Sequence, residues 1–235
     1  MKLVLHNYWR SSASYRVRIG LGLKQLAYDY VPVDILHGGQ QTAAYRSKNP
    51  MAQVPTLEII DAGEAGRTGA GERILLTQSL AILEYLDERW PAPPLLPRDP
   101  LLRARARALA EIINAGIQPL QNTATLRRIK ALGGEPLAWV QPFIIDGLAA
   151  FAALAEDTAG AFCVGDAPTI ADCCLVPQLY AARRYGVAID DRLARLVAIE
   201  QRCLALPAFA GADPDRQPEA TAPAAVTSEP QGQKS

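Results

Sequence analysis

A run of hydroxyl side chains stands between an apolar segment and a helical pattern near the start of the chain. Residues 3–5 are apolar, Ser11 and Ser12 lie in a short polar turn, and the helical pattern begins at Ser14. A strand that leads into a helix through such a turn presents hydroxyls and free backbone N–H groups at the helix start, where an anion is stabilised. A serine cap that binds nothing is the simpler interpretation. The turn by itself predicts an anion site and does not specify the ligand.

Two further segments carry groups that could complete such a site. Gln78 and Ser79 stand at the start of a predicted helix, where a hydroxyl and backbone N–H groups suit a carboxylate. Val54 precedes Pro55 at the entry to a predicted strand, so its backbone could pair with an extended peptide ligand. An ordinary serine cap and a strand-entry proline explain these two segments more simply when each is taken alone.

Length and charge limit the possible functions. The 235 residues suffice for one large domain or two ordinary ones. Lys and Arg together number 24, as do Asp and Glu, so no global field favours nucleic acid or an anionic membrane as a partner. We expect no membrane-spanning segment, because no apolar run approaches the necessary length. The N-terminus is too short and too polar for a secretory signal, so we expect a cytoplasmic protein.

The cysteines and histidines do not form a metal-binding pattern. The two histidines stand far apart, and the cysteines show neither a C-x-x-C pair nor a zinc spacing. We expect no metal, and we interpret the cysteines as buried small hydrophobic residues in a reducing compartment. All four lie in the second half of the chain: Cys163, Cys173, Cys174 and Cys203.

The first 90 residues alternate strand and helix signals in the order β-α-β-α-β-β-α. This order predicts an α/β layer with a mixed sheet, whose last two strands pair as a hairpin. The glycine-rich stretch 61–73 between these two strands lacks the Gly-Lys-Ser/Thr ending of a phosphate loop, so we expect a flexible hairpin extension there. The predicted strands are residues 3–5, 28–34, the segment after Pro55 and 74–76, and the predicted helices are 14–26, 40–47 and the segment after Ser79.

The second half of the chain is predicted to be all-helical. A proline-rich break indicates a linker at 91–100, and apolar stripes predict helices from 101 onward, at 136–157, at 170–185 and at 191–206. Gly116 and Pro119 should kink the first of these helices, and Thr169 with Asp172 should form a capping box. We therefore expect domains at 1–90 and 101–211. Residues 212–235 contain no aromatic residue and few aliphatic ones, which predicts a disordered tail.

An α/β layer followed by an all-helical domain resembles the glutathione transferase architecture, in which the first domain is thioredoxin-like. Residues 11–19, Ser-Ser-Ala-Ser-Tyr-Arg-Val-Arg-Ile, are similar to the zeta-class signature, in which two serines and a cysteine precede Ser-aromatic-Arg-Val-Arg-Ile. Segments 49–57, 78–82, 118–122 and 164–172 match the same class in order. The resemblance covers residues 2–218 and identifies the family as the zeta class, the maleylacetoacetate isomerases.

The resemblance implies that glutathione is the cofactor and that Ser11 and Ser12 are the catalytic residues, with Ser11 as the main one. Ser12 and Ala13 also line the cofactor site. A free thiol has a pKa of about 8.5, and lowering it by about two corresponds to roughly 2.7 kcal/mol of thiolate stabilisation. A hydroxyl donor and a helix N-terminus supply stabilisation of that kind. The implied reaction is thiolate addition to the cis double bond of a diketo acid, rotation, and expulsion of the thiolate. Tyr8 is a rival donor, although a core or interface tyrosine is the favoured interpretation.

The resemblance also implies how glutathione binds. It implies that Val54-Pro55 is a cis peptide that presents its backbone to the cysteinyl unit. Gln78 and Ser79 would hold the γ-glutamyl carboxylate. Gln40 would contact the glycyl end, with its neighbour Gln41 as the alternative. These residues would form the cofactor half of the site.

The substrate half is implied to contain cations, because the substrate carries carboxylates. Arg184 matches the family's carboxylate-binding arginine, Arg183 is the competing candidate, and Arg10 is a second substrate-binding candidate. Gln118 and Asn122, at positions i and i+4, would share one helix face that looks into the cleft and helps to bind the cofactor. A solvated helix face is nearly as good an explanation for either arginine at positions 183–184.

One departure from the family pattern bears on the chemistry. Ala13 stands where the family has a cysteine, so reactions that need a protein thiol are disfavoured, whereas isomerisation of maleylacetoacetate to fumarylacetoacetate in tyrosine and phenylalanine breakdown is retained. The alternatives are maleylpyruvate isomerisation, conjugation of α-halo acids, and a non-catalytic glutathione-fold binding module. The family further implies a homodimer that acts on a small diketo acid.

Overall fold

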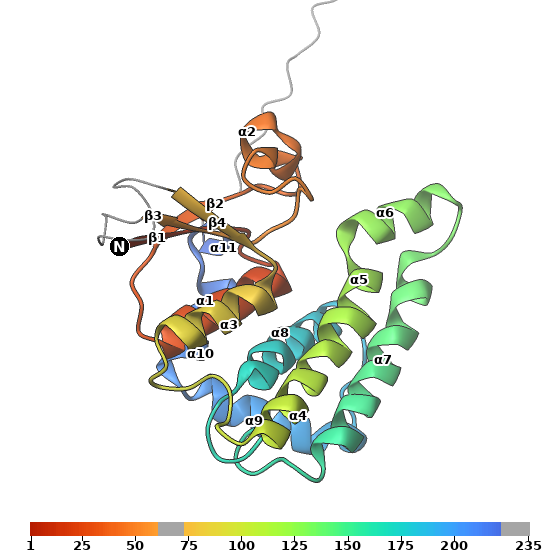
Figure 1. The fold of residues 1–235 in the computed structure, drawn as a ribbon. Coiled ribbons are helices and arrows are strands. Elements are labelled where there is room, and N and C mark those ends of the chain that lie inside the picture. The colour runs from red at the N-terminus through yellow and green to blue at the C-terminus, as the bar shows by residue number, and fades with distance from the viewer. Residues whose placement is uncertain (61–72, 222–235) are drawn as a thin grey trace, which may run out of the picture.

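The computed structural model describes residues 1–60 and 73–221. A four-stranded sheet with its helices forms one part of the molecule and a group of helices forms the other (Figure 1). The glycine-rich stretch, except for its last residue, and residues 222–235 lie outside the described residues, so the hairpin extension expected at 61–73 stays a prediction.

The N-terminal part has the predicted order β-α-β-α-β-β-α, which is confirmed. The strands lie in the order β2-β1-β3-β4, with β1 parallel to β2 and antiparallel to β3, and with β3 antiparallel to β4. The elements are β1 (Lys2–Asn7), α1 (Ser12–Leu23), β2 (Asp29–Pro32), the 3₁₀ turn η1 (Gly39–Gln41), α2 (Ala43–Arg46), β3 (Thr56–Ile60), β4 (Arg73–Thr77) and α3 (Ser79–Arg89).

The sheet is held by an apolar face that α1 and α3 cover together (Figure 1). Leu5 of β1 is opposite Leu57 of β3 in the register, and both are fully buried. They pack with Val17 of α1 and Ile82 of α3. Full burial of such a side chain contributes about 1.5–3 kcal/mol, so this face fixes both the register and the positions of the two helix starts.

All the named elements of the C-terminal part are helices or helical turns, with α8 at their centre (Figure 1). The kink predicted near Gly116 takes the form of a π-helical segment, η2, which separates α4 from α5. The elements are α4 (Pro100–Glu111), η2 (Ile112–Ile117), α5 (Gln118–Gln121), α6 (Thr123–Ala131), α7 (Pro136–Ala155), α8 (Ile170–Arg184), η3 (Asp191–Leu193), α9 (Ala194–Leu204), α10 (Pro207–Ala212), η4 (Pro214–Arg216) and α11 (Pro218–Thr221).

The two parts share a hydrophobic core, because α1 packs against α3 on one side and against α8 and α10 on the other. Tyr15 and Ile19 of α1 belong to the same cluster of buried residues as Leu175 and Leu179 of α8. The start of α1 therefore lies at the junction of the sheet layer and the helical part. A pocket at that junction is lined by both.

The prediction of a disordered tail from residue 212 is wrong for residues 212–221. These residues form the end of α10, η4 and α11. The buried Arg18 donates from Nε to the Ala212 carbonyl at 3.1 Å, and the Tyr30 hydroxyl donates to Glu219 at 2.7 Å. The segment is held by polar contacts to the first domain, which a low apolar content does not reveal.

The expectation that no apolar run could cross a bilayer needs a correction for α7. Its 20 residues have a mean hydropathy of 1.6 in the most apolar window, which is enough by length and composition. One face of α7 nevertheless lies in the core, where Val140, Ile144, Leu148 and Phe151 are fully buried. This face packs α7 against the helical part, while Leu137, Ile145 and Leu154 on the rest of the helix are exposed.

The start of α8 is organised by Asp172, which completes the predicted capping box. Its carboxylate is fully buried and accepts hydrogen bonds from the backbone N–H groups of Cys163 at 2.9 Å and Thr169 at 2.8 Å. Burial raises the pKa of this carboxyl, and the hydrogen bonds act against that rise. The two carboxylate oxygens of Asp172 thus join the loop that contains Cys163 to the start of α8.

We expect Asp172→Asn to lower the free energy of unfolding by about 1–3 kcal/mol, because the amide group would face one of two buried backbone donors and leave it without an acceptor. Urea unfolding followed by circular dichroism measures this change. Asp146→Asn, on the exposed side of α7, is the matched control and should change stability little. Equal stability of the Asp172 variant and the control would contradict the assigned role.

Candidate active site

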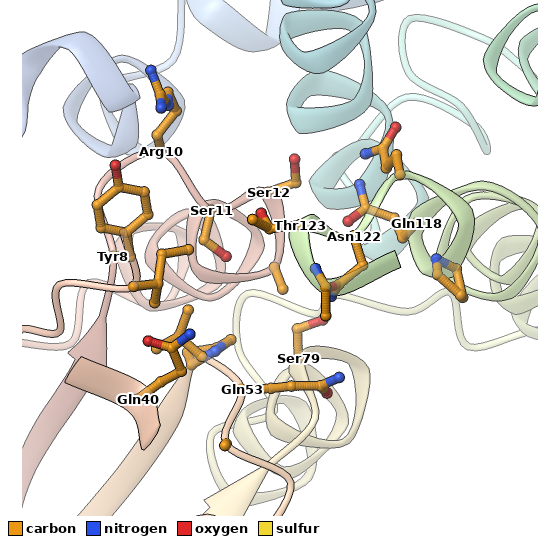
Figure 2. A pocket seen from close by; sticks show the side chains of 18 of the residues that line it. Tyr8, Arg10, Ser11, Ser12, Gln40, Gln53, Ser79, Gln118, Asn122 and Thr123 are labelled. Carbon is orange, nitrogen blue, oxygen red and sulfur yellow. The ribbon is translucent and has the colours of Figure 1, made fainter. Parts of the chain in front are cut away.

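A pocket of about 390 Å³ lies between the two parts of the molecule. One wall comes from the β1–α1 turn, the loop before β3 and the start of α3, and the other comes from η2, α5, α6 and the end of α8 (Figure 2). The structure brings all the sequence-predicted site residues into this pocket: Arg10, Ser11, Ser12, Ala13, Gln40, Val54, Pro55, Gln78, Ser79, Gln118, Asn122 and Arg184.

Ser11 is the N-cap of α1, and its side chain has a defined direction. Its Oγ accepts a hydrogen bond from the Ser14 N–H at 3.2 Å, so the hydroxyl proton remains available to a ligand. The turn before it is fixed by the Ser11 N–H, which donates to the Tyr8 carbonyl at 3.0 Å. Arg18 adds a bond from Nη2 to the Trp9 carbonyl at 2.8 Å. A hydroxyl donor therefore stands at a helix N-terminus in the pocket.

The start of α3 provides a second hydroxyl in a similar setting. Gln78, its N-cap, has φ 69°, a left-handed conformation that costs a non-glycine residue about 1–3 kcal/mol. Ser79 follows, and its Oγ accepts from Nη1 of Arg16 at 3.0 Å. Arg16, on α1, also donates to Oδ1 of Asn114 in η2 at 2.7 Å. The strained Gln78 backbone is consistent with a functional position.

The loop before β3 presents a peptide edge to the pocket. Val54-Pro55 is a cis peptide, as the resemblance implied. The Gln53 carbonyl before it accepts from the Tyr45 hydroxyl and from Nδ2 of Asn49, both at 2.7 Å. Neither backbone group of Val54 has a hydrogen-bond partner in the described part of the chain. This edge can pair with an extended peptide.

The structure separates the two adjacent glutamines. The side-chain oxygen of Gln41 accepts from Nη1 of Arg46 at 3.0 Å. That of Gln40 is buried without a hydrogen-bond partner, and Gln40 lies beside the pocket in Figure 2. A buried acceptor without a partner carries a desolvation cost in free energy. Gln40 is therefore the glutamine of the two that is free to accept a hydrogen bond from a ligand.

The two adjacent arginines at the end of α8 are also separated. Arg183 is held by Glu200, with Nη1 at 2.6 Å from Oε1. Arg184 lines the pocket and lies over the Tyr185 ring at 4.8 Å from its centroid. Arg10 lies over the Trp9 ring in the same way. The geometry makes Arg184 the arginine of this pair that can bind a carboxylate in the pocket.

The expectation that Gln118 and Asn122 share one helix face is wrong. α5 ends at Gln121, and Asn122 has an extended backbone that caps α6, with Oδ1 accepting from the Ala124 N–H at 2.9 Å. Gln118 donates from Nε2 to Gln178 at 2.9 Å. Both side chains still reach the pocket, but from different elements (Figure 2).

The lining residues that were not predicted from the sequence include two cations and an amide: Arg16, Arg127 and Asn114. With Arg10 and Arg184 they make a lining that has four arginines and, among the described residues, neither a carboxylate nor an imidazole. The signal for Arg16 was a cation in the middle of an apolar helical pattern, which requires a polar partner when it is buried. Such a lining favours a ligand with more than one negative charge.

Tyr8 occupies the wall of the pocket. It is 6 % exposed, and burial raises the pKa of its phenol, while nearby Arg10 acts in the opposite direction. Figure 2 shows its hydroxyl directed toward Arg10 and away from Ser11. Ser11 has an available proton at the helix start and is therefore better placed than Tyr8 to donate a hydrogen bond to a thiolate.

The described lining of the pocket contains no thiol. All four cysteines are buried elsewhere and free, and burial raises the pKa of each thiol. In residues 1–60 and 73–221 no group of three or more His, Cys, Asp and Glu could hold a metal ion. A nucleophilic sulfur in this site must come with a ligand.

The pocket fits glutathione as that ligand. Its volume lies in the range that takes a small molecule, about 300–1,000 Å³. The Val54 edge can pair with a peptide backbone, and the unpartnered Gln40 oxygen can accept from a terminal group. The starts of α1 and α3, with the hydroxyls of Ser11 and Ser79, can hold a thiol and a carboxylate. These are the chemical groups of a γ-glutamyl tripeptide.

Comparison with known proteins agrees with this assignment. Residues 5–94 match the model of the glutathione S-transferase N-terminal domain, and residues 138–202 match that of the C-terminal domain. A maleylacetoacetate isomerase of Rhizobium meliloti (strain 1021) is 46% identical over 218 residues, which are 91% of this chain and 96% of the relative.

Solved structures show the same likeness. The crystal structure of maleylacetoacetate isomerase from Anaeromyxobacter dehalogenans 2CP-1, with GSH bound in its active site, is 50% identical, with a TM-score of 0.82 and coverage of 93% of this chain and 98% of that one. The holo structure of a bacterial maleylpyruvate isomerase of the zeta class is 37% identical, with a TM-score of 0.81 and coverage of 92% and 99%. The chain therefore belongs to the glutathione S-transferase family, in its maleylacetoacetate isomerase (zeta-class) branch.

Proposed function

We propose that the protein is a glutathione-dependent isomerase that converts maleylacetoacetate to fumarylacetoacetate in tyrosine and phenylalanine breakdown. The observation that carries the proposal is the pocket itself, in which a hydroxyl donor at a helix start faces an arginine-rich lining without a protein thiol. Relatives named maleylacetoacetate isomerase, 46% and 42% identical to the chain, support the choice of substrate.

The cofactor half of the site would hold glutathione through contacts spread along its length. The backbone of Val54, next to Pro55, pairs with the cysteinyl unit, and Gln78 and Ser79 hold the γ-glutamyl carboxylate at the start of α3. Gln40 faces the glycyl end. Gln118 and Asn122 close the pocket from the helical part, while Ser12 and Ala13 line its floor. Together these contacts direct the thiol of the cofactor toward Ser11.

Ser11 stabilises the reactive form of the cofactor. Bound glutathione supplies the thiolate that adds to the cis double bond and leaves after rotation. The Ser11 hydroxyl donates its proton in a hydrogen bond to the sulfur, since its oxygen already accepts from Ser14. The N-terminus of α1 adds a favourable dipole. No imidazole or carboxylate of the described lining competes for the proton.

The substrate half uses arginines. Arg184 binds one carboxylate of the diketo acid, and Arg10 on the opposite wall is placed to bind another. Both guanidiniums rest on aromatic rings, which limits their freedom before the substrate arrives. We propose residues 101–211 as the substrate domain on this basis.

Maleylpyruvate is the second candidate substrate, because a zeta-class maleylpyruvate isomerase has nearly the same TM-score as the maleylacetoacetate isomerase structure. Isomerisation assays with both substrates, with and without glutathione, test the proposal. We expect turnover of maleylacetoacetate only when glutathione is present. Turnover without glutathione would contradict the mechanism, and glutathione binding without turnover of either substrate would favour a non-catalytic binding module.

We also propose a homodimer and a cytoplasmic location. The resemblance to the zeta class supports the first. Four free, buried cysteines support a reducing compartment and therefore the second. Sedimentation equilibrium of the purified protein tests the dimer, and a single species at the monomer mass would contradict it.

Replacing Ser11 tests whether its hydroxyl donates a hydrogen bond to the thiolate of the cofactor. We expect Ser11→Ala to lower kcat/KM for maleylacetoacetate by about 100-fold, the typical cost of losing one preorganised donor to a developing anion. Steady-state kinetics at saturating glutathione measure the change. Ser47→Ala, which removes an exposed hydroxyl from the end of α2, is the matched control and should retain the wild-type rate. Unchanged kinetics in Ser11→Ala would remove Ser11 from the mechanism.

The adjacent arginines of α8 offer a paired test of substrate binding. Arg184→Gln should raise KM for the diketo acid by about 10-fold or more, because a charge-assisted hydrogen bond is lost. Arg183→Gln should leave KM unchanged and lower thermal stability, because it leaves the buried Glu200 without its cation. The opposite pattern, with KM affected only through Arg183, would show that the pair is assigned in the wrong order.

A further inference from the structure

A buried cation without a carboxylate partner lies under the start of α3. Arg16 is 1 % exposed, and its Nη1 donates to two neutral acceptors, Ser79 Oγ and Asn114 Oδ1. Its Nε and Nη2 are buried and have no hydrogen-bond partner. Arg16 forms no ion pair with any acidic residue in the described ranges. A buried guanidinium without compensation is costly, so the arrangement favours an anion close by.

The hydrogen bond to Ser79 sets the direction of the serine hydroxyl. Because Ser79 Oγ accepts from Arg16, its own proton must point elsewhere, and Ser79 lines the pocket. The charge of Arg16 polarises this hydroxyl and makes it a stronger donor. A donor chain therefore runs from the buried guanidinium through Ser79 toward the pocket.

The nearest acidic side chain on this network is reached only through an amide. Nδ2 of Asn114 approaches Glu111 at 3.3 Å, and its Oδ1 accepts from Arg16. Glu111 is exposed to solvent, so its charge is screened. Asn114 thus separates Arg16 from the only carboxylate that this network of described residues contains. The positive charge remains available at the pocket end.

We propose, on the basis of the proposed function, that Arg16 is the positioning residue for the α-carboxylate of the γ-glutamyl unit of glutathione and that it acts through Ser79. Asn114 is the second acceptor for Arg16, after Ser79. Because its side chain is neutral, it leaves the positive charge of the guanidinium uncompensated. Asn114 belongs to η2 and Arg16 to α1. Residues from both parts of the molecule therefore contribute to binding the carboxylate of the cofactor.

The decisive variant is Asn114→Asp, which preserves shape and places a carboxylate where a neutral oxygen now lies 2.7 Å from Arg16. An internal carboxylate would neutralise the guanidinium and remove its effect on the ligand. We expect the Kd for glutathione, measured by calorimetry, to rise by about 10-fold or more. Gln201→Glu, on the exposed face of α9, adds the same charge far from the pocket and should leave Kd unchanged.

A matched ligand isolates the carboxylate. In 4-aminobutyryl-cysteinylglycine the α-carboxylate of glutathione is absent and the rest of the molecule is kept. The wild-type protein should bind this analogue about 10-fold or more weakly than glutathione. In Asn114→Asp the two ligands should bind with nearly equal Kd. A purely structural role of Asn114 would weaken both ligands equally and leave their ratio at the wild-type value.

Changing Arg16 itself gives an independent check. Arg16→Lys should retain part of the preference for glutathione, and Arg16→Gln should abolish it. If Arg16→Gln fails to fold, the ligand ratio in Asn114→Asp decides the question alone. A wild-type ratio in Asn114→Asp would overturn the inference, whereas failure of the wild-type protein to bind glutathione at all would overturn the proposed function.

Discussion

The buried guanidinium of Arg16 joins three of the segments that line the pocket. It starts from α1, donates to Ser79 at the start of α3, and donates to Asn114 in the π-helical segment η2. Two helix starts and the helical part are thereby held in one geometry by a single planar group. Because the cation has only neutral partners, the same contact that fixes the architecture also gives the pocket a positive character. Arg16 therefore contributes both to the geometry of the pocket and to its positive charge.

The hydrogen bonds within the protein determine which polar groups of the pocket remain free for a ligand. Ser11 and Ser79 each accept a hydrogen bond from the protein, so each keeps a proton for a ligand. Arg184 and Arg10 line the pocket, where we propose that they bind the substrate, while Arg183 is paired with Glu200. Ala13 takes the place of the family's cysteine, and none of the four buried cysteines lines the pocket. A nucleophilic cofactor is thus required by what the pocket lacks as much as by what it contains.

Much of this could be predicted from the sequence where the signal is local. Apolar runs and turn residues predicted the β-α-β-α-β-β-α order, and the Thr169–Asp172 spacing predicted the α8 cap. Long-range polar contacts could not be predicted in this way. Arg16 donates hydrogen bonds to residues 63 and 98 positions away in the sequence, and the sequence of α1 does not indicate which residues these are. The segment at 212–221 was missed for the same reason, because Arg18 and Tyr30 hold it. Asn122 was placed on a helix face, although asparagine favours a cap.

The proposed mechanism depends on a pocket that stabilises the thiolate of the bound cofactor. The most direct measurement is the pH titration of the thiol of glutathione bound to the wild-type protein, followed by the ultraviolet absorbance of the thiolate. A free thiol titrates with a pKa of about 8.5. We expect the pKa of the bound thiol to be lower than this value by about one or more, because a hydroxyl proton, a helix N-terminus and several guanidiniums all favour the anion. A midpoint at or above the free value, with glutathione demonstrably bound, would contradict it.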